Sequence, residues 1–105
     1  MKSVNIGGLT VSNDSPLVVI AGPCQLESLD HAQMIAGRMA EACAAAGAQY
    51  VFKASYDKAN RTSLKGKRGL GLDGGLKVLE AVRAMGMPVL TDIHDADQAR
   101  EAAKV

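Results

Sequence analysis

Three short apolar runs alternate along this chain with three segments of helical periodicity, and this alternation restricts the fold more than any other feature. The runs that predict strands are 17–21, 49–53 and 88–93. The first run is continuously apolar and ends at Gly22-Pro23, which is typical of a strand buried on both faces of a parallel sheet. A β-α-β-α-β-α series with short links predicts a parallel α/β fold, either an open doubly wound sheet or a (β/α)8 barrel.

Helix boundaries are predicted from capping residues and from the spacing of apolar side chains. Ser28 can cap a first helix that Gly47 ends. A second helix is expected over about 73–85, and a third from Asp95 to about position 104, with Asp95 and Gln98 at the spacing of a capping box. The side chains expected to face the core are Leu29, Ala32, Ala36, Met39 and Cys43 in the first helix and Leu76, Leu79 and Val82 in the second.

The N-terminal segment 4–12 alternates apolar and polar residues around Gly7-Gly8. Two glycines between alternating residues are a turn signal, so this segment predicts a β-hairpin. The chain reaches its last residue inside or just after the third predicted helix, so the series of elements is unfinished. We therefore expect the 105 residues to be part of a longer protein.

Composition excludes several classes of function. The formal net charge is +1 and the pI is near 7.8, below the values above about 9 that are typical of nucleic-acid-binding domains. Cys24 lies in a Gly-Pro-Cys turn and Cys43 in a predicted helix, which gives no disulfide framework and favours a reducing compartment. The run 17–21 is too short for a membrane span or a signal peptide. We expect a cytoplasmic protein that binds neither nucleic acid nor membranes.

Positive charge is concentrated directly after the second predicted strand. Six of the 12 Lys and Arg residues lie between positions 53 and 68, where Asp57 is the one acidic residue. Arg presents a planar fork of donors to phosphate oxygens and Lys a point charge, so this segment predicts the binding of a phosphorylated small molecule. The glycines from Gly66 to Gly75 do not follow the first strand, as a dinucleotide-binding fingerprint would, and a glycine-rich loop over an active site is the favoured interpretation.

Reactive side chains follow the ends of all three predicted strands. Cys24 follows the first, Lys53 and Ser55 the second, and Asp92 and His94 the third. Because the carboxyl ends of parallel strands meet at one edge of a sheet, we expect these groups to lie around one mouth. Each also has a purely structural interpretation, since a turn cysteine can fill space, an aspartate can cap a helix and a histidine can bond to backbone. Tyr50, Phe52 and Tyr56 are expected to pack in the core.

Four segments together resemble the 3-deoxy-D-manno-octulosonate 8-phosphate synthases, also called 2-dehydro-3-deoxyphosphooctonate aldolases. They are 22–28, 52–63, 68–72 and 91–94, and the likeness runs in order through essentially the whole chain. The specific part is Lys58-Ala-Asn60-Arg61, because the related 3-deoxy-D-arabino-heptulosonate 7-phosphate synthases are similar to Lys-Pro-Arg-Thr there. The resemblance implies a (β/α)8 barrel that condenses phosphoenolpyruvate with D-arabinose 5-phosphate for lipopolysaccharide biosynthesis. Residues 1–105 would supply its hairpin and first three βα units.

The resemblance also implies roles for individual residues. Those expected on the phosphoenolpyruvate side are Lys53, Ser55 and Lys58, those on the arabinose 5-phosphate side are Asn60, Arg61 and Thr62, and the catalytic candidates are Lys58, Asn60, Asp92 and His94. Thr62 stands where many relatives have serine, but the hydroxyl is kept. Cys24 matters more, because the metal-dependent class of this family has cysteine at this position and the metal-independent class has asparagine.

Cys24 is thus expected to bind a divalent transition metal ion together with a histidine, a glutamate and an aspartate beyond position 105. Family likeness further implies a homo-oligomer, namely a tetramer. Two alternatives stay open: a heptulosonate phosphate synthase that uses erythrose 4-phosphate, and a non-catalytic module that binds phosphate ligands or RNA through the basic segment. Because three of eight units cannot close a barrel, we expect residues 1–105 alone to be unstable and inactive.

Overall fold

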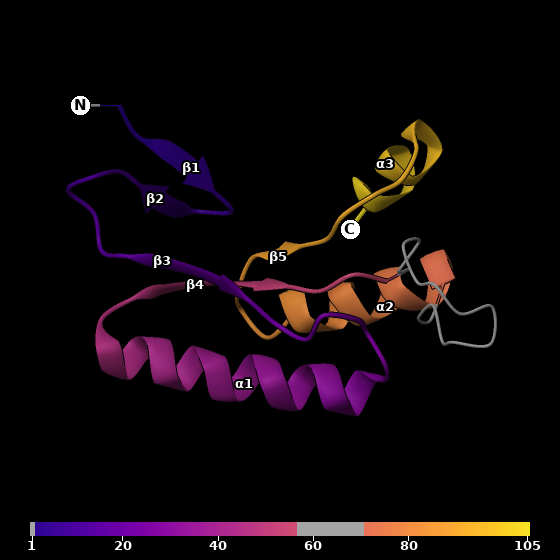
Figure 1. The fold of residues 1–105 in the computed structure, drawn as a ribbon, viewed down its shortest axis with the longest axis horizontal. Helices are drawn as coiled ribbons and strands as arrows, with labels where there is room; N and C mark the ends of the chain where they lie inside the picture. Colours follow the sequence, from indigo (N-terminus) through magenta and orange to yellow (C-terminus); the bar gives the residue numbers. More distant parts are fainter. Residues whose placement is uncertain (1, 57–70) are drawn as a thin grey trace.

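The computed structural model describes residues 2–56 and 71–105, which form a β-hairpin and a parallel sheet, with the first two helices along one side of the sheet and the last helix beyond the end of the last parallel strand (Figure 1). The hairpin strands are β1 (Val4–Ile6) and β2 (Leu9–Val11), and the parallel strands are β3 (Val18–Ala21), β4 (Gln49–Lys53) and β5 (Val89–Leu90). The helices are α1 (Leu29–Ala46), α2 (Gly71–Arg83) and α3 (Ala96–Ala102). The predicted order of elements is confirmed.

The N-terminal hairpin turns at two glycines and touches the start of β5. Gly7 and Gly8 have φ of 50° and 90°, the left-handed conformations that a two-residue hairpin turn needs. A Cβ atom on Gly7 would lie 2.9 Å from the side chain of Pro88, so the tip of the hairpin contacts this proline. The Gln49 side chain fixes β2 and the segment that follows it, because its Nε2 donates to Thr10 O at 2.8 Å and to Pro16 O at 3.0 Å.

The parallel sheet has the order β3-β4-β5, with Ile20 opposite Val51 and Lys53 opposite Leu90. Side chains alternate between its two faces. The face toward the helices carries Val19, Ala21, Tyr50, Phe52 and Val89, all of which belong to the hydrophobic core or pack against it. The opposite face carries Ile20, Val51, Lys53 and Leu90, and we call it the open face. Ile20 and Leu90 are 47% and 44% exposed there.

Helix α1 has the boundaries that the sequence predicts. The Ser28 hydroxyl accepts a hydrogen bond from the His31 N–H at 3.1 Å, and Gly47 ends the helix in the left-handed conformation with φ of 72°. Cys43 is buried in the core, as expected. The prediction for Leu29 was wrong, because its side chain is 43% exposed. Leu29 is the first helical residue, and helical side chains lean toward the N-terminus, here past the neighbouring elements.

Helix α2 lies against the end of β4. It begins two residues before the predicted start and buries the predicted face with Leu76, Leu79 and Val82. A Cβ atom on Gly75 would lie 2.2 Å from the Cβ of Tyr56, so the helix backbone sits directly on this tyrosine. Tyr56 is 1% exposed, and its prediction as a packed residue is confirmed.

Strand β5 is much shorter than the predicted strand 88–93. In the described residues its ladder with β4 has two pairs, Phe52 with Val89 and Lys53 with Leu90, because the chain then turns toward the start of α3. Beyond Leu90 the chain leaves the sheet and enters α3, whose N-cap is Asp95 as predicted. The Asp95 carboxylate accepts from Gln98 N at 2.8 Å. Gln98, however, does not close a capping box on Asp95, because its side chain accepts from the N–H of His94 instead.

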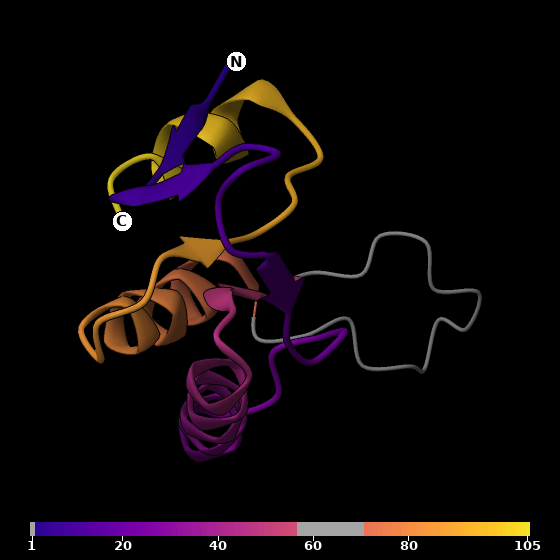
Figure 2. The same cartoon turned by 90° about the vertical axis from the view of Figure 1, so that its left-hand side faces the viewer.

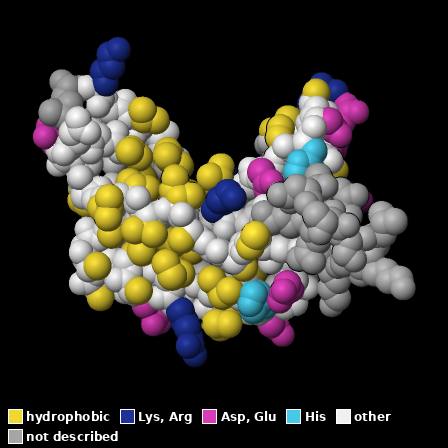
Figure 3. Space-filling view, in the orientation of Figure 1, with side chains coloured by type: hydrophobic (Ala, Val, Ile, Leu, Met, Phe, Trp, Pro, Cys, Tyr) yellow, Lys and Arg dark blue, Asp and Glu magenta, His cyan; other side chains and the backbone are white. Residues whose placement is uncertain are grey.

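The helices α1, α2 and α3 follow one another around the outside of the strands (Figure 2). The open face is hollowed between the hairpin and α3, and hydrophobic side chains gather on this side of the molecule (Figure 3). On the helix side, Tyr50 donates its hydroxyl to Ala21 O at 2.8 Å. Burial, with a smaller effect of Cys43, raises the pKa of Tyr50 to about 12.

Candidate functional site

The ends of β3 and β4 stay together beyond the last ladder residues. Ser55 N donates to Cys24 O at 3.3 Å, Leu26 N donates to Ser55 O at 2.8 Å, and Gln25 and Ser55 form a parallel bridge. These backbone bonds make Cys24 and Ser55 neighbours across two strands, although 31 positions separate them in sequence. The expectation that the strand ends meet at one edge is met for this pair.

Gly22 allows this close approach. A Cβ atom at position 22 would lie 2.1 Å from the carbonyl oxygen of Lys53, a distance that real Cβ contacts do not reach. The glycine therefore lets the Gly22-Pro23-Cys24 turn run directly over the end of β4.

The three functional groups at this edge differ in exposure. Ser55 is 0% exposed, and its hydroxyl has no hydrogen-bond partner among the residues that the structure describes. Cys24 is an exposed free thiol. Lys53 is partly buried, and the pairing with Leu90 places it on the open face at the end of β4. A buried hydroxyl without a partner is ready to donate to a ligand oxygen.

The end of β5 joins the same edge. Ala54 N donates to Leu90 O at 3.2 Å, which sets the β5 exit beside the residues that follow β4. Asp92 and His94 come next, Asp92 partly buried and His94 exposed. The rings of His94 and Tyr56 lie 6.5 Å apart between centroids and are tilted by 48°. The carboxylate and the imidazole thus follow the strand on the same edge as the thiol, the ammonium and the hydroxyl.

The predicted residues Lys58, Asn60, Arg61 and Thr62 lie outside the described part of the chain. Within residues 2–56 and 71–105, no group of three or more His, Cys, Asp or Glu side chains is placed to hold a metal ion. Cys24 is the exposed free thiol of these residues, and Cys43 is buried in the core, so a metal bound to Cys24 would need its other ligands from elsewhere.

Sequence reasoning missed the connection between Tyr56 and Gln98. The Tyr56 hydroxyl donates to Gln98 Oε1 at 2.6 Å, and the same oxygen accepts from His94 N at 2.7 Å. The sequence showed Tyr56 as a core residue and Gln98 as a capping partner. No local sequence pattern predicts a bond between residues 42 positions apart, so this bond is found only in the folded structure.

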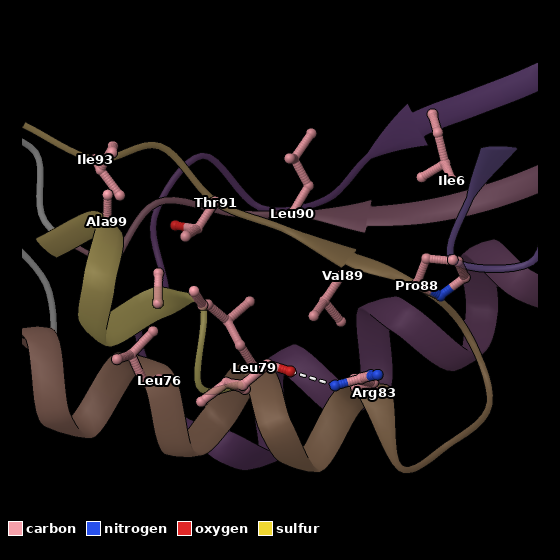
Figure 4. A pocket seen from close by; sticks show the side chains of 14 residues that line it. Ile6, Leu76, Leu79, Arg83, Pro88, Val89, Leu90, Thr91, Ile93 and Ala99 are labelled. Carbon is pink, nitrogen blue, oxygen red and sulfur yellow. Dashed lines mark hydrogen bonds between the residues drawn. The ribbon is translucent and has the colours of Figure 1, made fainter. Parts of the chain in front are cut away.

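A cavity of about 520 Å³ lies on the other side of β5, away from Cys24 and Ser55. Its walls come from the hairpin tip, β5, α2 and α3, and Figure 4 shows mostly apolar side chains, with Val89 pointing toward Leu79. Arg83 lies at its rim and donates from Nη1 to the carbonyl oxygen of Val105. Of the predicted site residues that the structure describes, none lines this cavity.

Fold and strand-end chemistry place the chain in the class of parallel α/β proteins that bind their ligands at the carboxyl edge of the sheet. The sequence profile of the DAHP synthetase I family matches residues 3–105. The chain therefore belongs to this family.

Individual relatives carry a more specific name. Proteins named 2-dehydro-3-deoxyphosphooctonate aldolase are 50% identical to the chain in Granulibacter bethesdensis, 45% in Rickettsia bellii and 53% in a Chelativorans species. The alignments cover 98%, 99% and 90% of this chain and 37%, 38% and 35% of the respective relatives. The chain thus spans little more than a third of the length of these relatives. No helix in the described residues is long and apolar enough to cross a membrane.

Proposed function

We propose that this chain forms the first three βα units of a (β/α)8 barrel enzyme that condenses phosphoenolpyruvate with D-arabinose 5-phosphate. The products are 3-deoxy-D-manno-octulosonate 8-phosphate and inorganic phosphate, in lipopolysaccharide biosynthesis. The observation that carries the proposal is the gathering of Cys24, Lys53, Ser55, Asp92 and His94 at one sheet edge, in a chain that is half identical to proteins named for this product.

The open face supports a closed barrel over an open doubly wound sheet. A doubly wound sheet covers both faces with helices, whereas α1 and α2 here both lie along one side of the sheet (Figure 2). On the other face, Ile20 and Val51 stand opposite each other, and Leu90 stands opposite Lys53 two residues further along β4. Branched apolar residues in that position suit the packed interior of a barrel.

The chemistry assigned to the site begins with the phosphoenolpyruvate anion. Lys53 supplies positive charge at the mouth, and the buried Ser55 hydroxyl would find its missing partner in a phosphate or carboxylate oxygen of this substrate. The enol carbon attacks the sugar aldehyde, water adds at the neighbouring carbon, and the carbon–oxygen bond to phosphate then breaks. Groups fixed before the reaction hold the two anions and stabilise the charge that develops at the aldehyde oxygen.

The remaining roles rest on family likeness. Lys58 is assigned to the reacting centre, and Asn60, Arg61 and Thr62 to arabinose 5-phosphate. Asp92 and His94 follow β5 at the same edge of the sheet, and we assign them to this site, where a carboxylate and an imidazole can orient sugar hydroxyls or transfer protons. We further assign the enzyme to the cytoplasm as a homotetramer.

A divalent transition metal ion would be held in part by Cys24. The exposed thiol at the mouth suits this role, since thiolates are ligands that transition metals prefer. When bound, the metal would orient the sugar aldehyde or activate water.

The alternative acceptor is erythrose 4-phosphate, which the family name favours and the names of the relatives disfavour. The deciding experiment follows the loss of phosphoenolpyruvate by the full-length gene product with each sugar phosphate. Turnover with arabinose 5-phosphate supports the proposal, and turnover with erythrose 4-phosphate alone overturns it.

The metal is tested separately on the same preparation. We expect a chelator to abolish turnover, and elemental analysis to find less metal in Cys24→Ala than in the wild-type protein. Turnover that survives the chelator, with equal metal content in both proteins, would remove Cys24 from the site while keeping the enzyme family.

A further inference from the structure

One oxygen atom connects the β5 side of the candidate site to the end of β4. Gln98 Oε1 accepts from the Tyr56 hydroxyl at 2.6 Å and from the backbone N–H of His94 at 2.7 Å. The Gln98 backbone is itself fixed, because its N–H donates to the Asp95 cap at 2.8 Å. The amide side chain therefore joins three points: the first turn of α3, the loop that carries Asp92 and His94, and Tyr56.

Tyr56 is a rigid anchor for this connection. Its side chain is 1% exposed, and the backbone of Gly75 in α2 lies directly against its Cβ. It also follows Ser55 immediately, so it moves with the residues assigned to phosphoenolpyruvate. A group that is hydrogen-bonded to Tyr56 is therefore fixed in position relative to that half of the site.

The loop that Gln98 holds continues past the β4–β5 ladder. Strand pairing between β4 and β5 ends at Lys53 and Leu90, and Ala54 N–Leu90 O is the next backbone bond between them. Asp92 and His94 lie two and four residues beyond Leu90. Gln98 bonds this segment beyond the last backbone bond between β4 and β5 that the structure describes.

We propose that Gln98 is a positioning residue that sets the Asp92–His94 loop in register with Lys53 and Ser55 through Tyr56. The inference rests on the proposed function, because it concerns the geometry of that same site. Gln98 need not touch a substrate to act. A displacement of about 1 Å in a group that takes part in a reaction can lower the rate about 100-fold, so a side chain that fixes the loop has a large effect on turnover.

The test uses four variants of the full-length gene product. Gln98→Met keeps the size of the side chain but removes the acceptor, Gln98→Glu keeps an acceptor oxygen, and Tyr56→Phe removes only the hydroxyl. Gln33→Met makes the same exchange of side chains on α1, at a residue that is not assigned to the site. We expect Gln98→Met to lower kcat by about 10- to 100-fold with a smaller change in the KM for phosphoenolpyruvate. Gln98→Glu should lose much less, and Gln33→Met should match the wild type.

Two further readouts separate positioning from simple loss of stability. In the double variant, Tyr56→Phe should add little to the loss of kcat from Gln98→Met, because one oxygen serves both bonds. Amide hydrogen exchange at His94 should be slow in the wild-type protein and faster in Gln98→Met, and slow again in Gln98→Glu.

Two results would overturn the inference: additive losses in the double variant, or wild-type kcat in Gln98→Met. His94 exchange that is equally slow with and without the Gln98 acceptor would do the same. The exchange measurement needs no turnover, so it also distinguishes the two proposals. If the wild-type protein does not consume phosphoenolpyruvate, the proposed function fails, and exchange at His94 still shows whether Gln98 holds the loop.

Discussion

The two halves of the candidate site are held by different kinds of hydrogen bond. Cys24 and Ser55 form the ladder half, where backbone hydrogen bonds continue the β3–β4 pairing past the ends of the strands. Asp92 and His94 form the tethered half, which lies beyond the short β5 and is held through the side chains of Gln98 and Tyr56. The first half depends on how closely two backbones approach, and the second on which side chains are present.

This difference teaches where each half is vulnerable. A backbone ladder tolerates changes of side chain except where a side chain would separate the strands, as at Gly22. A tether fails when one acceptor atom is lost, even if the sheet is intact. Substitutions in the ladder half should therefore reveal themselves in stability or substrate binding, and those in the tethered half in turnover.

The largest effect is expected from Gly22→Ala. Its Cβ would stand 2.1 Å from Lys53 O, so β3 and β4 would have to separate, and we expect a loss of about 3 kcal/mol or more in the free energy of unfolding. Urea unfolding of the full-length protein measures this. Gly37→Ala inside α1 is the control, since its Cβ would meet only Met85 Cε at 3.9 Å. This substitution should stabilise the protein by about 0.5–1 kcal/mol, because glycine is a poor helix former. Equal stabilities of the two variants would contradict the close approach.

Ser55→Ala should affect binding and leave stability almost unchanged. Its buried hydroxyl has no partner in the described residues, so its removal costs the fold little, whereas a hydrogen bond to an anionic ligand contributes about 1.5–3 kcal/mol. We expect the KM for phosphoenolpyruvate to rise about 10- to 100-fold at a stability within about 0.5 kcal/mol of the wild type. Thr91→Val is the control, because Thr91 Oγ1 is another buried hydroxyl atom without a described partner, but beside the 520 Å³ cavity. A larger change of KM in Thr91→Val than in Ser55→Ala would contradict the assignment of Ser55 to phosphoenolpyruvate binding.

Substitutions of two helix-capping residues allow a direct comparison of the two halves. Ser28 caps α1 and Asp95 caps α3, and replacing either by alanine should lower the free energy of unfolding by about 1 kcal/mol. Asp95→Ala also releases the first turn that carries Gln98, so we expect it to lower kcat while Ser28→Ala does not. Steady-state kinetics beside unfolding curves check both effects. If the two variants lose kcat equally, the tethered half has no special sensitivity.

The smallest effect is expected at Tyr50, which supports the ladder half from the helix side. Tyr50→Phe removes the bond to Ala21 O, and we expect a loss of about 1 kcal/mol at neutral pH. Folding raises the pKa of Tyr50 from its ordinary value near 10 to about 12, so the folded state holds the phenolic proton more tightly. The stability from this group is complete below pH 10 and falls as pH rises to 12. The advantage of the wild type over Tyr50→Phe should shrink across that range, and a constant difference would contradict it.

The sequence predicted what local chemistry decides. Gly7-Gly8 dictates the hairpin turn, Ser28 and Gly47 bound α1 by bonding neighbouring backbone groups, and the spacing of Leu76, Leu79 and Val82 marks the buried face of α2. The positions of the candidate site residues at strand ends followed from the alternation of elements. These features depend on groups a few positions apart, which a sequence displays.

Features that depend on distant partners were not predicted. The apolar run 88–93 fits a longer strand, but in the described residues its pairing with β4 ends at Leu90, after which the chain turns toward α3. Gln98 fits a capping box by spacing, yet its oxygen bonds to Tyr56 across 42 positions and to His94 rather than Asp95. In both cases, the length of β5 and the partners of Gln98 depend on which elements are neighbours in the fold. That information is spread over the whole chain.

The contact between the hairpin tip and Pro88 has a consequence for the order of events on the ribosome. Synthesis completes the hairpin at Val11, whereas Pro88, which the hairpin tip contacts, is translated roughly 80 residues later. At about 5–20 residues per second, the nascent hairpin waits on the order of 4–16 s for this proline. During that interval β3 gains its partner β4, so the hairpin can dock on Pro88 only after these two strands have been made.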